Sequence, residues 1–174
     1  MFAFERGISE VVFRFVNQAV FLKPLLVFCA EILPYIIIAV FIVKLFSIKS
    51  LKLRYHHLFT VSLGVLISRG LVAEVIGHFF RVARPFITLN LEPIINHPDT
   101  ASFPSGHMSF LTPIAIMAIG MDKKMGYQLL GATIVCGISR MALGLHWPSD
   151  ILGGIAVGLI GYIIADRLVP KKLS

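Results

Sequence analysis

One short stretch holds most of the residues that could do chemistry. Residues 139–150 read Ser-Arg-Met-Ala-Leu-Gly-Leu-His-Trp-Pro-Ser-Asp and contain Arg140, His146 and Asp150. An arginine in apolar surroundings needs an anionic partner. A carboxylate four residues after a histidine can orient the ring if a helix begins between them. The pattern predicts an anion site beside an oriented histidine nucleophile or base. The alternative is a pore-facing arginine near an unrelated His and Asp.

Two other motifs have the same chemical character. Arg84-Pro85 places a guanidinium where proline stops a helix. Pro104-Ser105-Gly106-His107 predicts a helix start, where free backbone N–H groups and a glycine form an anion cradle. Ser105 can add a hydroxyl donor and His107 can move a proton. A simple turn with a helix cap is the alternative for this second motif.

The composition is that of a membrane protein. Of the 174 residues, 57% are hydrophobic and 14% charged, and the mean hydropathy is +0.87. The net charge of +7 comes from basic residues that cluster in short connections between apolar runs. That distribution indicates membrane topology and leaves no continuous basic face for nucleic acid. Cys29 and Cys136 lie inside apolar runs and are expected to be packed thiols.

We predict an all-α integral membrane protein: a single domain, residues 1–174, with a bundle of five transmembrane helices. Residues 1–22 are expected to form an amphipathic helix at the interface, because Arg6, Glu10 and Arg14 recur at four-residue spacing. Insertion of that helix would give six spans. Gly154 and Gly158 are expected to serve close helix packing within the bundle. The five predicted spans are residues 24–46, 58–82, 105–121, 125–143 and 148–169.

Charge also predicts the orientation. The connection 47–57, the turn 122–124 and the tail with Lys171 and Lys172 are basic, and the positive-inside rule places them in the cytoplasm. The loop 83–103 and the three motifs then collect at the extracytoplasmic face.

Together the three motifs resemble those of the type 2 phosphatidic acid phosphatase superfamily, and the span pattern extends the resemblance to nearly the whole chain. The resemblance implies that His146 attacks phosphorus and becomes a phosphohistidine, with Asp150 accepting a hydrogen bond from the other ring nitrogen. It implies that His107 is the general acid for the leaving group and then the base for water. The implied phosphate-binding groups are Arg84, Arg140, Ser105 and the Gly106 N–H.

The resemblance also implies an inner-membrane lipid phosphatase of the small bacterial branch, with the site facing the periplasm. Neither a metal nor another cofactor is expected, because two guanidinium groups and backbone dipoles can stabilise the phosphoryl charge. The partners would be the bilayer and a lipid phosphate, and nucleic acid is not expected. Candidate substrates are undecaprenyl diphosphate, phosphatidylglycerophosphate, lipid A 1-phosphate and phosphatidic acid. The alternatives are a transporter or channel and a vanadate-dependent haloperoxidase-like protein, although the peroxidases of this superfamily are soluble.

One family position differs. The family usually has a lysine seven residues before the arginine of Arg-Pro, and this chain has Gly77 there. Arg81 is predicted to supply the missing phosphate-binding cation from one turn before Arg84, in preference to His78. Three further expectations concern other residues. Arg69 and Glu74 should form an ion pair with each other or with Glu31, His97 and Asp99 should be solvated or touch a head group, and Trp147 should anchor at the membrane interface.

Overall fold

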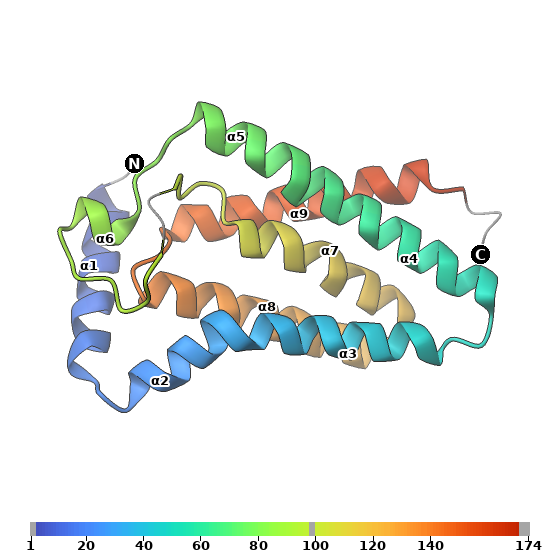
Figure 1. Cartoon of the computed structure of the whole chain (residues 1–174), viewed down its shortest axis with the longest axis horizontal. Helices are drawn as coiled ribbons and strands as arrows, with labels where there is room; N and C mark the ends of the chain where they lie inside the picture. The colour runs from blue at the N-terminus through green and yellow to red at the C-terminus, as the bar shows by residue number, and fades with distance from the viewer. Residues whose placement is uncertain (1–2, 98–99, 171–174) are drawn as a thin grey trace.

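Five helical segments run side by side in the computed structural model, which describes residues 3–97 and 100–170 (Figure 1). The first joins α2 (Leu22–Val27), η1 (Phe28–Ile32) and α3 (Leu33–Ser47), and the second joins α4 (Leu51–Val65), η2 (Leu66–Val72) and α5 (Ala73–Phe79). Here η marks a turn of π-helix. The others are α7 (Gly106–Met121), α8 (Lys123–Ala142) and α9 (Pro148–Leu168), with α1 (Ala3–Gln18) and α6 (Pro85–Thr88) at one end. No strand occurs in the described ranges, so the predicted all-α class is confirmed.

Three of these segments are long and apolar enough to cross a bilayer: Leu22–Ser47, Leu51–Phe79 and Pro148–Leu168. Helix α7 is a shorter apolar helix. The outward faces of the segments carry exposed apolar side chains, among them Val43, Leu66 and Leu152. An apolar solvent suits such a surface, and the chain is a multi-pass membrane protein.

Helix α7 lies at the centre of the bundle, with α8, α9, α4 and α3 packed around it. Its residues are buried on nearly every side, as Met108, Leu111 and Ala115 show. Close packing of α9 depends on two small residues. A Cβ at Gly158 would lie 2.6 Å from the Thr112 Cβ, and one at Gly154 would lie 2.6 Å from the Ser105 carbonyl oxygen. The predicted role of Gly154 and Gly158 in packing within the bundle is confirmed.

The basic connections meet at one end of the bundle (Figure 1). The Lys44 Nζ lies 2.9 Å from the Asp122 Oδ2, which joins the end of α3 to the α7–α8 turn. The predicted connection 47–57 is wrong in length, because α4 already begins at Leu51. Ser50 caps that helix by accepting from the Leu53 N–H at 3.3 Å, and Arg54 donates to carbonyls at the end of α3. Basic side chains are good helix formers, so charge alone did not mark a loop. Lys171 and Lys172 lie outside the described residues.

At the opposite end the second predicted span is too long. Helix α5 stops at Phe79, and residues 80–84 are not helical. Arg84 is extended, with φ −68° and ψ 154°, as expected for a residue before proline. The loop predicted for residues 83–103 contains the short helix α6. Its Phe86 N–H donates to the Gly144 carbonyl at 3.1 Å, so α6 is attached to the segment before His146.

Helix α1 runs across this same end of the bundle (Figure 1). One face is buried against the protein and includes Glu5, Ser9, Phe13 and Val16. A second face exposes Phe4, Val11 and Phe15, and a third carries the polar residues predicted from the sequence, with Arg14 paired to Glu10 at 2.8 Å. The predicted amphipathic helix is therefore present, but its apolar residues are divided between the protein and the exterior.

Candidate active site

A cleft of about 1030 Å³ opens at the end of the bundle that carries α1 and α6. Its walls come from the start of α3, from η2 and α5, from the start of α7, from the end of α8 and from the loops that precede α7 and α9. Among its described lining residues, Glu74 is the one carboxylate, whereas four residues are arginines and four are histidines. The basic lining residues are Arg69, Arg81, Arg84, Arg140, His78, His97, His107 and His146. Such a cleft suits an anionic ligand.

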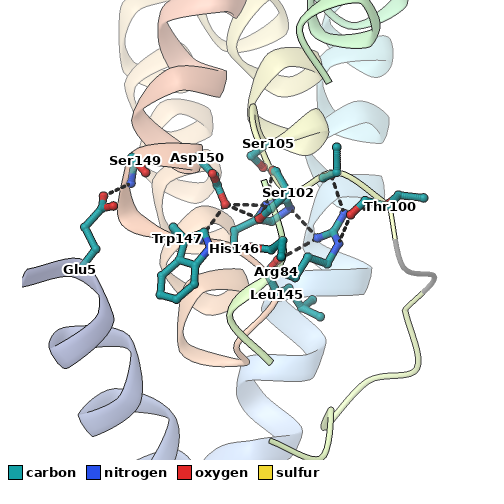
Figure 2. Close-up of polar contacts among 12 residues, drawn as sticks. Glu5, Arg84, Thr100, Ser102, Ser105, Leu145, His146, Trp147, Ser149 and Asp150 are labelled. Carbon is teal, nitrogen blue, oxygen red and sulfur yellow. Dashed lines mark hydrogen bonds and ion pairs between the residues drawn. The ribbon is translucent and has the colours of Figure 1, made fainter. Parts of the chain in front are cut away.

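The His146 ring has hydrogen-bond acceptors near one nitrogen and a hydrogen-bond donor near the other (Figure 2). Its Nδ1 is 3.0 Å from the Ser102 carbonyl oxygen and 3.5 Å from the Asp150 Oδ2. Its Nε2 is 3.5 Å from the Arg84 Nη1, which can only donate. Nδ1 therefore carries the proton, and Nε2 keeps its lone pair on the side of the cleft. The acceptor closest to Nδ1 is the carbonyl of Ser102. Ser102 was not predicted from the sequence.

Asp150 organises the turn that presents His146. Its Oδ2 accepts from the Trp147 N–H at 2.7 Å and from the Ser102 hydroxyl, and these contacts form the start of α9. Asp150 thus holds the His146 ring partly through Ser102, in addition to its own longer contact. Trp147 is fully buried and donates from Nε1 to the Ala83 carbonyl at 2.9 Å. The prediction that Trp147 anchors at the membrane interface is wrong, because this hydrogen bond and full burial place it inside the protein.

Arg84 connects three parts of the site. Its guanidinium donates to the Leu145 carbonyl at 2.7 Å, directly before His146. It also donates to the Thr100 carbonyl and hydroxyl, at 3.2 and 3.1 Å, and to the Ala101 carbonyl at 3.3 Å (Figure 2). Arg84 is 4% exposed, so these bonds fix its position. The same segment then supplies Ser102 to His146.

Arg140 and His107 form the neighbouring part of the site. The Arg140 Nη1 lies 3.4 Å from the His107 Nε2, 2.9 Å from the Glu31 Oε1 and 3.2 Å from the Ala30 carbonyl. Ala30 and Glu31 belong to the π-helical turn η1, and such turns release backbone groups and are frequent at functional sites. Glu31 therefore pairs with Arg140, and Arg69 pairs with Glu74 as one of the two predicted arrangements had it.

Helix α7 begins against the cleft. The first helical hydrogen bond runs from the Ser109 N–H to the Ser105 carbonyl, so the N–H groups of Gly106, His107 and Met108 precede the hydrogen-bond ladder. Gly106 and His107 line the cleft. Ser105 is fully buried; its hydroxyl has no hydrogen-bond partner in residues 3–97 and 100–170, and it does not line the cleft. The structure brings Gly106 and His107 to the cleft and leaves the Ser105 hydroxyl behind its wall.

Arg81 does not have the position predicted for it. It lies beyond the end of α5, in the non-helical segment 80–84, so it is not one helical turn from Arg84. Its side chain is exposed at the edge of the cleft. Gly77, His78 and His97 also line the cleft, whereas Asp99 lies outside the described residues.

Helix α1 packs against the loop that carries His146 and accepts a hydrogen bond from a residue that follows this loop. Glu5 is 8% exposed, and its Oε1 accepts from the Ser149 N–H at 3.0 Å, at the start of α9. Phe13 packs on Gly144, where a Cβ would lie 2.8 Å from the ring. Gly144 has φ +74°, a left-handed conformation that favours glycine. Nothing in the spacing of α1 pointed to Glu5, because its partner is 144 residues away.

Replacing Glu5 should destabilise this end of the protein. Glu5→Ala leaves the Ser149 N–H without its acceptor, and loss of such a cap costs about 1 kcal/mol. We expect a lower thermal midpoint in detergent and reduced turnover at high temperature. Glu10→Ala is the matched control, because Glu10 lies on the same helix in a surface pair with Arg14. Equal midpoints for the two variants would contradict the bracing role of Glu5.

Burial and charge keep His146 neutral. Removal from water, which is the largest cause, and the guanidinium groups of Arg84 and Arg140 together lower the pKa of His146 to about 4. The hydrogen bond to Asp150 opposes this shift. The ring is therefore neutral at neutral pH, with its one proton on Nδ1, and its Nε2 lone pair is available as a nucleophile.

Two Bacillus proteins are similar to this chain in sequence. The chain is 28% identical over 164 residues to the bacitracin transport permease protein BcrC of Bacillus licheniformis, covering 91% of this chain and 79% of that protein. It is 34% identical over 91 residues to the undecaprenyl-diphosphatase BcrC of Bacillus subtilis, covering 50% of this chain and 47% of that protein.

A solved structure gives the same fold. The first transmembrane PAP2 type phosphatidylglycerolphosphate phosphatase from Bacillus subtilis superposes with a TM-score of 0.69 at 18% identity, covering 96% of this chain and 86% of that one. Residues 59–173 match the PAP2 superfamily, and this range contains all three sequence motifs. The chain belongs to the PAP2 superfamily, which is the type 2 phosphatidic acid phosphatase superfamily that its three motifs resemble.

Proposed function

We propose that this protein hydrolyses a phosphate monoester or diphosphate of a membrane lipid through a phosphohistidine on His146. The orientation of that ring carries the proposal: Nδ1 is 3.0 Å from the Ser102 carbonyl, and Nε2 faces the arginine-lined cleft. Family membership and relatives named as lipid phosphatases or diphosphatases support the reaction class. The guanidinium groups of Arg84 and Arg140 would hold the phosphoryl oxygens.

The first step forms a bond between the His146 Nε2 and phosphorus. The bond from phosphorus to the leaving oxygen breaks, and that oxygen takes a proton from His107. Negative charge on a bound phosphate favours the protonated form of an adjacent imidazole, which provides that proton. The His146 Nδ1–H stays hydrogen-bonded to Ser102, so the positive charge that develops on the ring is stabilised by the nearby Asp150.

The second step returns the enzyme to its starting state. A water oxygen attacks phosphorus while His107 accepts the water proton, and the bond between phosphorus and the His146 Nε2 breaks. Inorganic phosphate leaves, and His146 regains its lone pair. Backbone N–H groups at the start of α7 and the guanidinium groups stabilise the charged transition states of both steps.

The fold and the charge pattern also support a proposal for the membrane arrangement. We propose that α7, α8 and the three long segments make five spans, with α1 lying at the interface on its exposed Phe4, Val11 and Phe15. The basic end of the bundle would face the cytoplasm, and the cleft would open at the outer face of a bacterial inner membrane. The candidate substrates are those expected from the sequence, from undecaprenyl diphosphate to phosphatidic acid.

A panel of lipid phosphates tests this proposal. Purified protein in detergent is given undecaprenyl diphosphate, phosphatidylglycerophosphate, lipid A and phosphatidic acid, each with and without EDTA, and inorganic phosphate is measured. We expect release from at least one lipid, unchanged by EDTA. The absence of release from all four, with the protein folded, would contradict the proposal. It would favour the transport alternative, which the name of the Bacillus licheniformis relative suggests.

The acid limb of the pH profile is a second test. Protonation of the His146 Nε2 removes the nucleophile, and the pKa of His146 is lowered to about 4. We expect kcat/KM to fall as the pH drops through about 4, well below the ordinary histidine pKa. The His146 ring of the unfolded chain takes up this proton near the ordinary histidine pKa, whereas the folded protein takes it up only near pH 4. The fold therefore loses stability as the pH falls from the ordinary histidine pKa to about 4. An acid limb centred near the ordinary histidine pKa would contradict this account.

A further inference from the structure

Arg69 has a place in the cleft that the predicted ion pair does not explain. It belongs to the π-helical turn η2, and its side chain is 42% exposed although it lies within an apolar segment. A π-turn rotates the following side chains relative to a regular helix, and such turns recur at functional sites. Arg69 lines the cleft together with Arg84, Arg140 and His107.

The side chain of Arg69 lies against the start of α7. A Cβ at Gly106 would be 2.8 Å from the Arg69 Nε and 3.3 Å from its Cζ. Only a residue without a side chain lets the guanidinium approach here. Arg69 is thereby placed beside the N–H groups of α7 that precede the hydrogen-bond ladder, and both point to the same kind of ligand.

The partner of Arg69 can be exchanged. Its Nη1 forms an ion pair with Glu74, whose side chain is 62% exposed. Exposed pairs of this kind contribute little to stability. Arg84, by contrast, is 4% exposed and donates to backbone carbonyls, and Arg140 is 1% exposed. A dianionic phosphate entering the cleft would compete with Glu74 for Arg69 more readily than with the backbone carbonyls for Arg84.

There is open space in the same cleft beside Gly77. Gly77 lines the same cleft, and a Cβ there would meet its nearest atoms, the Phe103 carbonyl oxygen and the Ala101 Cβ, only at 3.6 and 3.7 Å. Arg81, the cation predicted from the sequence, lies beyond the end of α5 and is exposed.

We propose that Arg69 binds the substrate phosphate as the third guanidinium of the site, and that Glu74 is the counter-ion that the phosphate replaces. This inference rests on the proposed function.

Two measurements distinguish a failure of this inference from a failure of the proposed function: binding of phosphate and turnover of lipid. Binding of orthophosphate to the intact protein is measured by calorimetry in detergent, and kcat and KM are measured with the best lipid. We expect Arg69→Ala to weaken orthophosphate binding about tenfold and to lower kcat/KM about 10²-fold. Arg69→Lys should recover part of both, and Glu74→Gln should tighten orthophosphate binding. Arg14→Ala is the matched control, because Arg14 also pairs with a glutamate on its own helix.

Gly77→Lys in the Arg69→Ala background supplies a cation from another position in the cleft and should restore part of the binding. Arg81→Ala should lose less binding than Arg69→Ala. Unchanged orthophosphate binding in a folded Arg69→Ala protein, or a larger loss in Arg81→Ala, would overturn the inference. If the wild type binds orthophosphate through Arg69 but releases none from any lipid, the proposed function fails and the binding role of Arg69 stands.

Discussion

His146→Ala is expected to lower kcat for lipid phosphate release on the order of 10⁴-fold or more, because the proposed mechanism has no second nucleophile. The variant removes the Nε2 that forms the bond to phosphorus. It leaves the arginines that bind the substrate in place, so KM should change much less than kcat. The measurement is phosphate release at saturating lipid, over a range of enzyme concentrations that reaches the uncatalysed rate.

His57→Ala is the matched control, since His57 lies in α4 outside the cleft. His146→Gln serves as a second variant, because its amide can still donate toward the Ser102 carbonyl and support the fold. Residual activity within about tenfold of wild type in a folded His146 variant would contradict nucleophilic catalysis, since general acid–base effects alone reach about 10²-fold or more.

His107→Ala is expected to lower kcat by about 10²- to 10⁴-fold for a lipid alkyl phosphate. Its proton is needed by an alkoxide leaving group and much less by a phenolate, which leaves unprotonated. The loss in kcat/KM should therefore be clearly smaller with p-nitrophenyl phosphate in detergent. The measurement is the ratio of wild-type to variant kcat/KM for the two substrates, because kcat/KM reports the step in which the leaving group departs and not the later hydrolysis of the phosphoenzyme.

Equal losses with both leaving groups would contradict general-acid catalysis and would indicate that His107 only binds the phosphate. Thermal unfolding in the same detergent checks the fold, with His57→Ala again as the control. Because His107 also has to activate water, the variant should accumulate phosphoenzyme with the aryl substrate. That accumulation separates the two roles of this residue.

The sequence predicted the general architecture and the components of the site for clear physical reasons. Long apolar runs can satisfy their backbone groups in lipid only as helices, so the segments were visible from hydropathy. Arg84, His107, Arg140 and His146 are costly in such a chain, and the structure brings all four to one cleft. Local spacing also predicted α1, although its contacts with the protein were not visible.

Residues that act through backbone or distant contacts were not predictable. Ser102 contributes a carbonyl oxygen, which every residue has, so no side-chain pattern distinguishes it. Arg69 was visible as an intramembrane charge, but its approach to Gly106 depends on a π-turn that the sequence does not announce. The helix start at Leu51 was missed because the Ser50 cap, rather than hydropathy, determines it, and α5 ends at Phe79, well before the Pro85 that was expected to stop the helix.

The most direct test of the central claim is to trap the covalent intermediate. Protein mixed with a lipid carrying ³²P in its terminal phosphate is quenched in alkali within milliseconds, digested and mapped. We expect an alkali-stable, acid-labile label on the peptide that contains His146, formed at the rate of the first turnover and absent in His146→Ala. Full phosphate release without labelled protein, or a label on another residue, would contradict a phosphohistidine at His146.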